Sequence, residues 1–123
     1  LCAPVRLDAS AATWPIAHAD AIVCINMIHI SPWSATQGLF AGAARVLPAG
    51  ALLYLYGPYR FAGEFTAASN AEFDRSLRAR DAAWGVRDVD DLVACAEAQG
   101  FTLRETIAMP ANNHSLLFRA QAA

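Results

Sequence analysis

The chain carries little charge, and the charge it has is not concentrated anywhere. Only 16% of the 123 residues are charged, and all nine basic residues are arginines spread along the sequence without a basic block. The formal net charge is −2. Such a distribution offers no positive groove for nucleic acid and no basic face for an anionic membrane surface, so the composition favours a small, weakly charged partner.

Cysteine pairs at metal-binding or redox spacing are also missing. Cys2, Cys24 and Cys95 form no C-x-x-C motif, and the three histidines are isolated from one another. Because the cysteines are odd in number and one lies inside an apolar run, we expect reduced thiols in a cytoplasmic protein. We expect no metal site, since no group of residues has the spacing of metal ligands.

Long apolar runs are absent as well. No stretch reaches the roughly 18 to 20 residues of a membrane span, and no basic segment opens a signal peptide. The hydrophobic fraction is nevertheless 56%, which argues against disorder and predicts a soluble, globular domain. The sequence begins at Leu1 and enters a predicted short strand at residues 5–7 almost at once, so we expect a preceding segment.

Residues 19–33 indicate the fold most clearly. The apolar run Ala21–Ile25 predicts a strand covered on both faces, and the chain turns polar and aromatic directly after it. Asn26, His29 and Trp33 follow the carboxyl end of this strand, where a parallel α/β sheet binds its ligands. The pattern therefore predicts the floor of a cofactor site.

A strand–helix–strand unit continues from this run. The dipeptide Ser31-Pro32 is typical of a helix start, and the apolar spacing predicts a helix over residues 32–47. A second buried strand is predicted over residues 51–56. Because such a unit joins parallel neighbours, we expect residues 26–29 and 56–59 at the same edge of the sheet.

The remaining sequence predicts a loop, two further helices and a hairpin. Residues 60–68 have no clean period and are expected to form a mobile loop over the strand ends. The capping box S-x-x-E at residues 69–72 predicts one helix start, and Asp88 predicts another. Phe101–Met109 and residues 115–119 are predicted strands, and their short connection allows only an antiparallel pair.

Four strings carry a family resemblance: NMIHISPW (residues 26–33), LYGPY (55–59), SNAEFDRSLRARDAAWGVRD (69–88) and MPANNHSLLF (109–118). Through them nearly the whole chain resembles a little-characterised family of class I S-adenosylmethionine-dependent methyltransferase-like proteins. The resemblance implies a Rossmann-like α/β sheet of seven strands. The 123 residues would form the carboxyl-terminal half of that single domain, with a parallel βαβ unit followed by an antiparallel hairpin.

The chain departs from the family where the cofactor's methionine part would bind. Members carry a glycine-rich turn upstream, but no G-x-G occurs here, and the acidic residue for the ribose hydroxyls is absent as well. The family's first strand would lie beside Ala21–Ile25, so the fragment would expose a hydrophobic edge. We expect that the 123 residues alone cannot methylate, and that they self-associate or require the missing half.

The resemblance implies S-adenosylmethionine as the cofactor and places Asp8 and Ala9 near its adenine amino group, where a carboxylate accepts a hydrogen bond. Asp8 also suits a turn. Ile25, Asn26 and Met27 would line the adenosine at the end of the central strand. Plain core packing explains Ile25 and Met27 as well, whereas an asparagine is costly to bury without a partner, which favours a functional Asn26.

His29 is the candidate catalytic residue. An imidazole at the crevice can take a proton from an oxygen or nitrogen acceptor as the methyl group is transferred. A lone histidine is also common in protein cores, and the sequence shows no partner for this one. Burial of His29 by core residues would favour a non-catalytic protein.

The candidate substrate residues lie on two segments. Those near the strand ends would form an aromatic wall around a small-molecule acceptor, and those on the predicted helix that the S-x-x-E box opens share one face through their four-residue spacing. Core packing is the alternative for the first group, and a solvated face with an ion pair is the alternative for the second. The six candidates are Trp33, Tyr56, Pro58, Asn70, Asp74 and Arg78.

Methyl transfer from S-adenosylmethionine to a small acceptor is the function we expect of the longer parent chain, with positioning as the main source of catalysis. Two alternatives stay open. One is a non-catalytic module that binds the cofactor or another protein, and the other is a nucleotide-dependent oxidoreductase. The predicted hairpin argues against the oxidoreductase, because a purely parallel dinucleotide-binding sheet lacks one, but fold alone decides neither.

Overall fold

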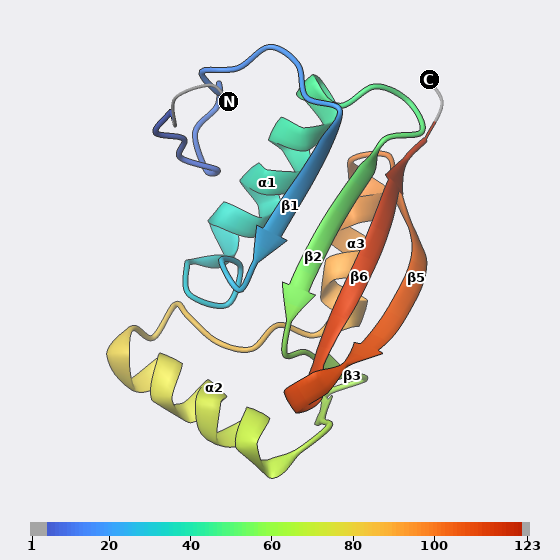
Figure 1. The fold of residues 1–123 in the computed structure, drawn as a ribbon. Helices are drawn as coiled ribbons and strands as arrows, with labels where there is room; N and C mark the ends of the chain where they lie inside the picture. Colours follow the sequence, from blue (N-terminus) through green and yellow to red (C-terminus); the bar gives the residue numbers. More distant parts are fainter. Residues whose placement is uncertain (1–4, 122–123) are drawn as a thin grey trace.

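The computed structural model describes residues 5–121, which form one four-stranded sheet with helices on one of its faces (Figure 1). The elements in chain order are β1 (Ala21–Ile25), α1 (Trp33–Val46), β2 (Leu52–Gly57), β3 (Arg60–Phe61), β4 (Glu64–Phe65), α2 (Ala68–Arg80), α3 (Val89–Ala98), β5 (Phe101–Met109), a 3₁₀ turn (Pro110–Asn112) and β6 (Asn113–Ala120). The strand order is β1-β2-β6-β5, and β3 pairs separately with β4.

The strands β1 and β2 are parallel and, with α1, form the predicted βαβ unit. Their register pairs Ile25 with Tyr56, so the two strands end together. The N–H of Asn26 donates to the Tyr56 carbonyl at 2.9 Å and extends this ladder by one residue. Because β6 runs antiparallel to β2 and β5, the mixed α/β class and the terminal hairpin are both confirmed.

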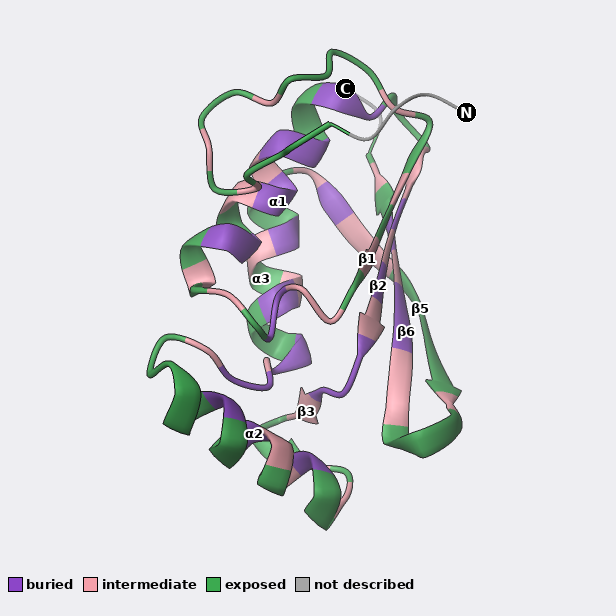
Figure 2. Cartoon of the chain, turned by 60° about the vertical axis from the view of Figure 1, so that its left-hand side comes forward, coloured by how far each residue is buried: buried purple, intermediate pink, exposed green. Residues whose placement is uncertain are grey.

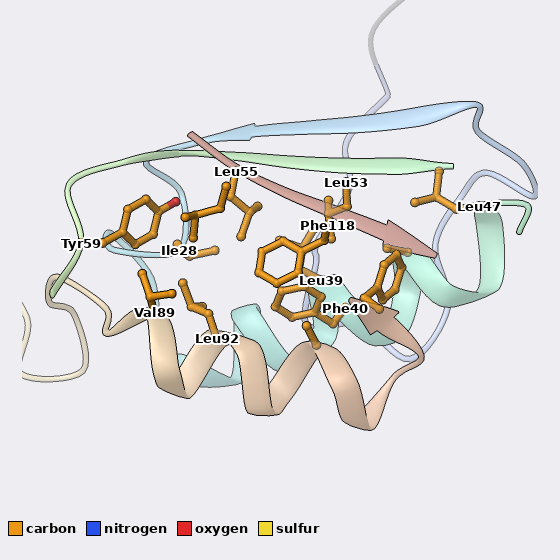
Figure 3. Packing of buried hydrophobic residues seen from close by; sticks show 14 of the residues in the cluster. Ile28, Leu39, Phe40, Leu47, Leu53, Leu55, Tyr59, Val89, Leu92 and Phe118 are labelled. Atoms are coloured by element: carbon orange, nitrogen blue, oxygen red, sulfur yellow. The ribbon is translucent and has the colours of Figure 1, made fainter. Parts of the chain in front are cut away.

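The core lies between the sheet and the helices α1 and α3 (Figure 3). Phe40 of α1 packs against Phe101 and Phe118, with ring centroids 5.9 and 5.3 Å apart. Leu53 and Leu55 of β2 are fully buried against the same layer. Since burying a large apolar side chain contributes about 1.5–3 kcal/mol, this layer is the main source of stability for the described residues.

The strand β1 lies at one edge of the described sheet, and it is not covered on both faces as predicted. Val23 and Ile25 are 65% and 61% exposed, while Ile22 and Cys24 on the other face are partly buried toward the helices. Figure 1 shows α1 and α3 behind the sheet, with no described helix in front of it. The expected hydrophobic edge is therefore present in these residues.

Residues 5–7 form no strand, contrary to the prediction, because no described strand lies beside them. The segment that follows instead packs on α1 at two glycines. A Cβ placed on Gly38 would lie 2.2 Å from the Ala9 carbonyl oxygen, and one on Gly42 would lie 2.1 Å from the Trp14 ring. The four-residue spacing of these glycines gives α1 a flat strip on which the segment rests.

One of the three predicted helix caps is confirmed. The Asp88 carboxylate accepts a hydrogen bond from the N–H of Asp90 at 2.9 Å and caps α3. The Ser31 hydroxyl instead donates to the Met27 carbonyl at 2.6 Å, and Pro32 is the N-cap of α1. The capping box is wrong as well, because α2 begins at residue 68 and Ser69 already lies inside its first turn.

The segment expected as an irregular loop over residues 60–68 contains the small ladder of β3 and β4, whose turn uses positive φ at Ala62 and Gly63. The N–H of Gly63 donates to the Asp88 carboxylate at 2.6 Å, which ties this turn to the start of α3. At the tip of the β5–β6 hairpin, positive φ falls on Ala111 and Asn112. None of the helices in residues 5–121 has the length and apolar character to cross a membrane.

Candidate functional site

A tight turn, residues 26–30, follows the carboxyl end of β1. Asn26 has a φ of 60°, a left-handed conformation that asparagine tolerates better than most residues. The N–H of His29 donates to the Asn26 carbonyl at 3.2 Å, and that of Ile30 donates to the Met27 carbonyl at 3.2 Å. The turn therefore fixes the position of His29 directly under the strand ends.

His29 is buried, with none of its surface exposed. Its ring lies edge-on to Tyr59 with centroids 5.0 Å apart. The Nδ1 atom accepts a hydrogen bond from the N–H of Arg87 at 3.1 Å. A neutral imidazole that accepts at Nδ1 carries its proton at Nε2, so this hydrogen-bond pattern assigns the Nε2–H tautomer.

The charge state of His29 follows from the same surroundings. Burial, and next the positive charge of Arg87, lower the pKa of His29 to about 3. The ring is therefore neutral at physiological pH, and its buried Nε2 atom already holds a proton. In this arrangement Nδ1 is occupied by the Arg87 N–H and Nε2 is protonated, so His29 has no free nitrogen to act as a base.

Two buried polar atoms without a hydrogen-bond partner in the described residues lie around Gly57. They are Oδ1 of Asn26 and Nε2 of His29. A Cβ placed on Gly57 would lie 2.7 Å from the first and 2.9 Å from the second, so both atoms approach the same backbone position. A side chain at position 57 would overlap both, which explains the glycine at the end of β2.

A cleft of about 650 Å³ lies between β1, the first turns of α1 and the segment over residues 7–16. Its lining is mostly apolar, and Asp8 is the charged side chain in it. The Asp8 Oδ1 atom accepts hydrogen bonds from the backbone N–H and the hydroxyl of Ser10 at 3.0 and 2.6 Å. These bonds lower the pKa of Asp8, which keeps the carboxylate ionised at neutral pH.

The structure brings together three of the five predicted cofactor residues. Asp8, Ala9 and Met27 line this cleft, which we call the β1 cleft. Ile25 points to the exposed face of β1 and does not line it, and Asn26 faces Gly57 instead. The segment with Asp8 and the turn after β1 are thus neighbours in space, although 18 residues separate Asp8 from Asn26.

Two of the predicted substrate residues on α2 hold the structure together. The Asp74 carboxylate is 8% exposed, and it accepts a hydrogen bond from the N–H of Val86 at 2.9 Å. Arg78 Nε contacts both its oxygens at 3.0 and 3.1 Å. The ion pair of the alternative interpretation is present. Asp74 faces the chain between α2 and α3, whereas the Arg78 side chain is 51% exposed, in keeping with the largely exposed surface of α2 (Figure 2).

The other substrate candidates are distributed around the strand ends. Asn70 donates to the Thr66 hydroxyl and to the Asn112 carbonyl, both at 3.1 Å, and so links α2 to the hairpin tip. Pro58 is buried, and Tyr56 is half-buried on the face of the sheet that carries Ile25. Trp33 lies at the start of α1. A role for any of them in substrate binding stays a prediction.

Sequence reasoning missed Arg87. Its Nε donates to the Ile28 carbonyl at 2.9 Å, and its Nη2 donates to the carbonyls of Ser31 and Ala83 at 2.7 and 2.9 Å. Two of these contacts join positions 56 and 59 residues apart, so no local spacing indicates them. Arg87 fastens the turn after β1 to the segment before α3.

No group of three His, Cys, Asp or Glu side chains within residues 5–121 has an arrangement that could hold a metal ion. Cys24 and Cys95 are both free thiols, partly buried and too isolated to pair. Burial raises the pKa of each thiol. Neither thiol is therefore a nucleophile at neutral pH.

Comparison with known proteins finds one matching family and several solved structures with a similar fold. A family model described as "Protein of unknown function (DUF938)" matches residues 1–120. Human N-acetylserotonin methyltransferase, solved with S-adenosylmethionine, matches with a TM-score of 0.79 at 11% identity over 94% of this chain and 32% of that chain. CalO1, a methyltransferase in calicheamicin biosynthesis, matches with a TM-score of 0.71 at 18% identity over 87% and 31%.

The mitomycin 7-O-methyltransferase MmcR matches as well, with a TM-score of 0.72 at 16% identity over 83% of this chain and 30% of that chain. The chain spans about a third of the length of these solved structures. At such low identity the likeness establishes the fold, and that fold is methyltransferase-like.

Proposed function

Because the chain belongs to the family described as "Protein of unknown function (DUF938)", we infer its function from the site itself, and we propose that this domain serves S-adenosylmethionine-dependent methyl transfer to a small acceptor. The observation that carries the proposal is the β1 cleft. It combines an ionised carboxylate with apolar walls along β1 and the turn after it, and open α/β sheets bind nucleotide ligands at the carboxyl ends of their strands.

The residues of the β1 cleft fit the adenosine part of the cofactor. Asp8 Oδ1 is engaged by Ser10, but Oδ2 makes no hydrogen bond within the described residues and is available to the adenine amino group. Met27 and Leu39 offer apolar surface for the adenine ring. The flat strip at Gly38 keeps the segment with Asp8 close to α1, so the carboxylate is held on a supported backbone.

The methionine part of the cofactor has no comparable support here. No G-x-G occurs in the sequence, and β1 is an edge strand of the described sheet, where the backbone of a further strand would pair. We therefore propose that these 123 residues are the carboxyl-terminal half of a longer domain, and that alone they do not transfer a methyl group. The free thiols Cys24 and Cys95 support a cytoplasmic setting for it.

S-Adenosylmethionine, when bound, supplies a methyl group on a sulfonium that is already reactive. The part of this chain would be to hold the acceptor near it and to exclude water. Arg87 fixes the turn after β1 through the carbonyls of Ile28 and Ser31, and the Nδ1 atom of His29 in this turn accepts the backbone N–H of Arg87. We therefore assign His29 as a positioning residue that presents Nε2–H, in place of the base that the sequence suggested.

A specific observation favours one alternative, the non-catalytic module that binds the cofactor or another protein. His29 is enclosed by core residues, which is the arrangement expected of such a module. An assay with labelled S-adenosylmethionine and a set of phenolic, amine and carboxylate acceptors separates the two functions, because a module binds the cofactor and transfers nothing.

Replacing Asp8 with asparagine in the full-length protein tests the cleft directly. The neutral amide cannot offer the adenine amino group a charged acceptor, and hydrogen bonds to charged groups are stronger than those between neutral groups. We expect about a tenfold or greater rise in the dissociation constant for S-adenosylhomocysteine, measured by calorimetry. Glu97→Gln on the exposed side of α3 is the control, and equal affinity for both variants would contradict the assignment.

A further inference from the structure

A second cleft, of about 660 Å³, lies on the helical side of the molecule between α1 and α3. It shares no lining residue with the β1 cleft. Trp33 and Gln37 of α1 form one wall, and Ala94, Cys95 and Ala98 of α3 form the other. Its floor at one end consists of Arg60 and Arg87, so we call it the two-arginine cleft.

Both guanidinium groups are held in place without a carboxylate partner. Arg87 is fixed by three backbone carbonyls, and its Cζ atom lies 5.5 Å from the centroid of the Trp33 ring. Arg60 Nε donates to the Val86 carbonyl at 3.1 Å, and its backbone N–H donates to the Arg87 carbonyl at 3.0 Å. Within residues 5–121 neither arginine forms an ion pair.

Several N–H groups of this arginine pair are free to bind a ligand. Nη1 of Arg87 and both terminal nitrogens of Arg60 make no hydrogen bond to described residues. The pKa of Arg87 is lowered by burial and next by the charges of Arg78 and Arg60, while the charge of Asp74 acts in the opposite direction. An anion at this end of the cleft would reduce that repulsion.

Two acidic residues, Asp88 and Asp91, also line the cleft, and neither forms an ion pair with Arg60 or Arg87 within the described residues. Both carboxylate oxygens of Asp88 already accept backbone hydrogen bonds, from Gly63 at 2.6 Å and from Asp90 at 2.9 Å. Asp91 is exposed and lies three residues further along α3. Beyond it the α3 wall is small and uncharged, so the cleft has two arginines without ion-pair partners at one end and an apolar body.

We propose that the two-arginine cleft binds a small organic carboxylate, with the carboxylate at Arg60 and Arg87 and the uncharged body between Trp33 and Ala94. The planar guanidinium matches a carboxylate through two parallel N–H bonds, and it gains specificity when it is already held in place. The indole and the alanines suit a flat or short aliphatic group. This site is independent of the cofactor and of methyl transfer.

The test titrates the full-length protein with benzoate, with its neutral isostere benzamide, and with inorganic phosphate. We expect saturable benzoate binding that shifts the Trp33 indole N–H resonance in NMR spectra, and binding of benzamide that is at least about tenfold weaker because it lacks the charge. Equal binding of benzoate and benzamide would overturn the proposal. Displacement of benzoate by phosphate at comparable concentration would overturn the carboxylate assignment in favour of a general oxyanion site.

Variants locate the site. Arg60→Gln should weaken benzoate binding about tenfold or more, whereas Arg75→Gln, on an exposed position of α2, should leave it unchanged. Ala94→Phe fills the body of the cleft without touching the arginines and should abolish binding. Circular dichroism establishes that each variant is folded, and undiminished binding by a folded Ala94→Phe protein would overturn the proposal even if Arg60→Gln does not fold.

Discussion

Replacing Arg87 with alanine is expected to lower the free energy of unfolding by about 3 kcal/mol, one of the largest effects of any single substitution in this domain. The guanidinium donates to the carbonyls of Ile28, Ser31 and Ala83. Alanine leaves those carbonyls without their donors and removes the side chain that covers Trp33. Urea denaturation of the full-length protein, followed by circular dichroism, measures the loss.

Two matched variants show whether geometry or charge is responsible. Arg87→Lys keeps the charge, but an ammonium on a flexible stem cannot replace the fixed fork that reaches these carbonyls, so we expect most of the loss to remain. Arg75→Ala removes an exposed arginine of α2 and should change stability by no more than about 0.5 kcal/mol. A loss of stability for Arg87→Ala as small as that for Arg75→Ala would contradict the stabilising role of the Arg87 hydrogen bonds.

Placing lysine at both Val23 and Ile25 is expected to have opposite effects in the isolated chain and in the full-length protein. In the 123-residue chain these side chains are 65% and 61% exposed on an edge strand, so we expect the wild-type fragment to self-associate and the double variant to be monomeric. Light scattering after size-exclusion chromatography distinguishes the two.

In the full-length protein we propose that a further strand and its helices cover this face. Two lysines there would be buried without partners, and we expect a destabilisation of several kcal/mol, on the order of 4 kcal/mol or more, or a failure to fold. Arg45→Lys on the exposed side of α1 serves as the control for added lysine. Unchanged stability of the double variant would show that β1 is solvent-exposed in the whole protein.

Local signals in the sequence predicted the bounds of two strands and one helix cap. The bounds of β1 and β5 follow from an apolar run and from alternation, and Asp88 caps α3 because its carboxylate needs only the N–H two residues on. The serine caps failed for local reasons, and at Ser69 the reason is that α2 begins one residue earlier. Ser31 turns back to Met27, because the chain after β1 makes a tight turn that the sequence does not reveal.

The chemistry of the site depended even more on distant residues. His29 follows the strand end as predicted, but its burial and its tautomer are set by Tyr59 and Arg87, which come 30 and 58 residues later. Asp8 was a candidate from the resemblance alone, and the strip at Gly38 and Gly42 that carries its segment was not recognised. Glycines four residues apart inside a predicted helix were the available signal for that contact.

The most direct test of the account is calorimetric titration of S-adenosylmethionine and S-adenosylhomocysteine into the full-length protein and into the 123-residue chain at matched concentration. We predict binding of both ligands to the full-length protein, and at most weak binding to the 123 residues, because these supply the adenosine cleft without the methionine cradle. Absence of binding to the full-length protein would contradict the assignment of the β1 cleft and leave an interaction module as the function of this fold.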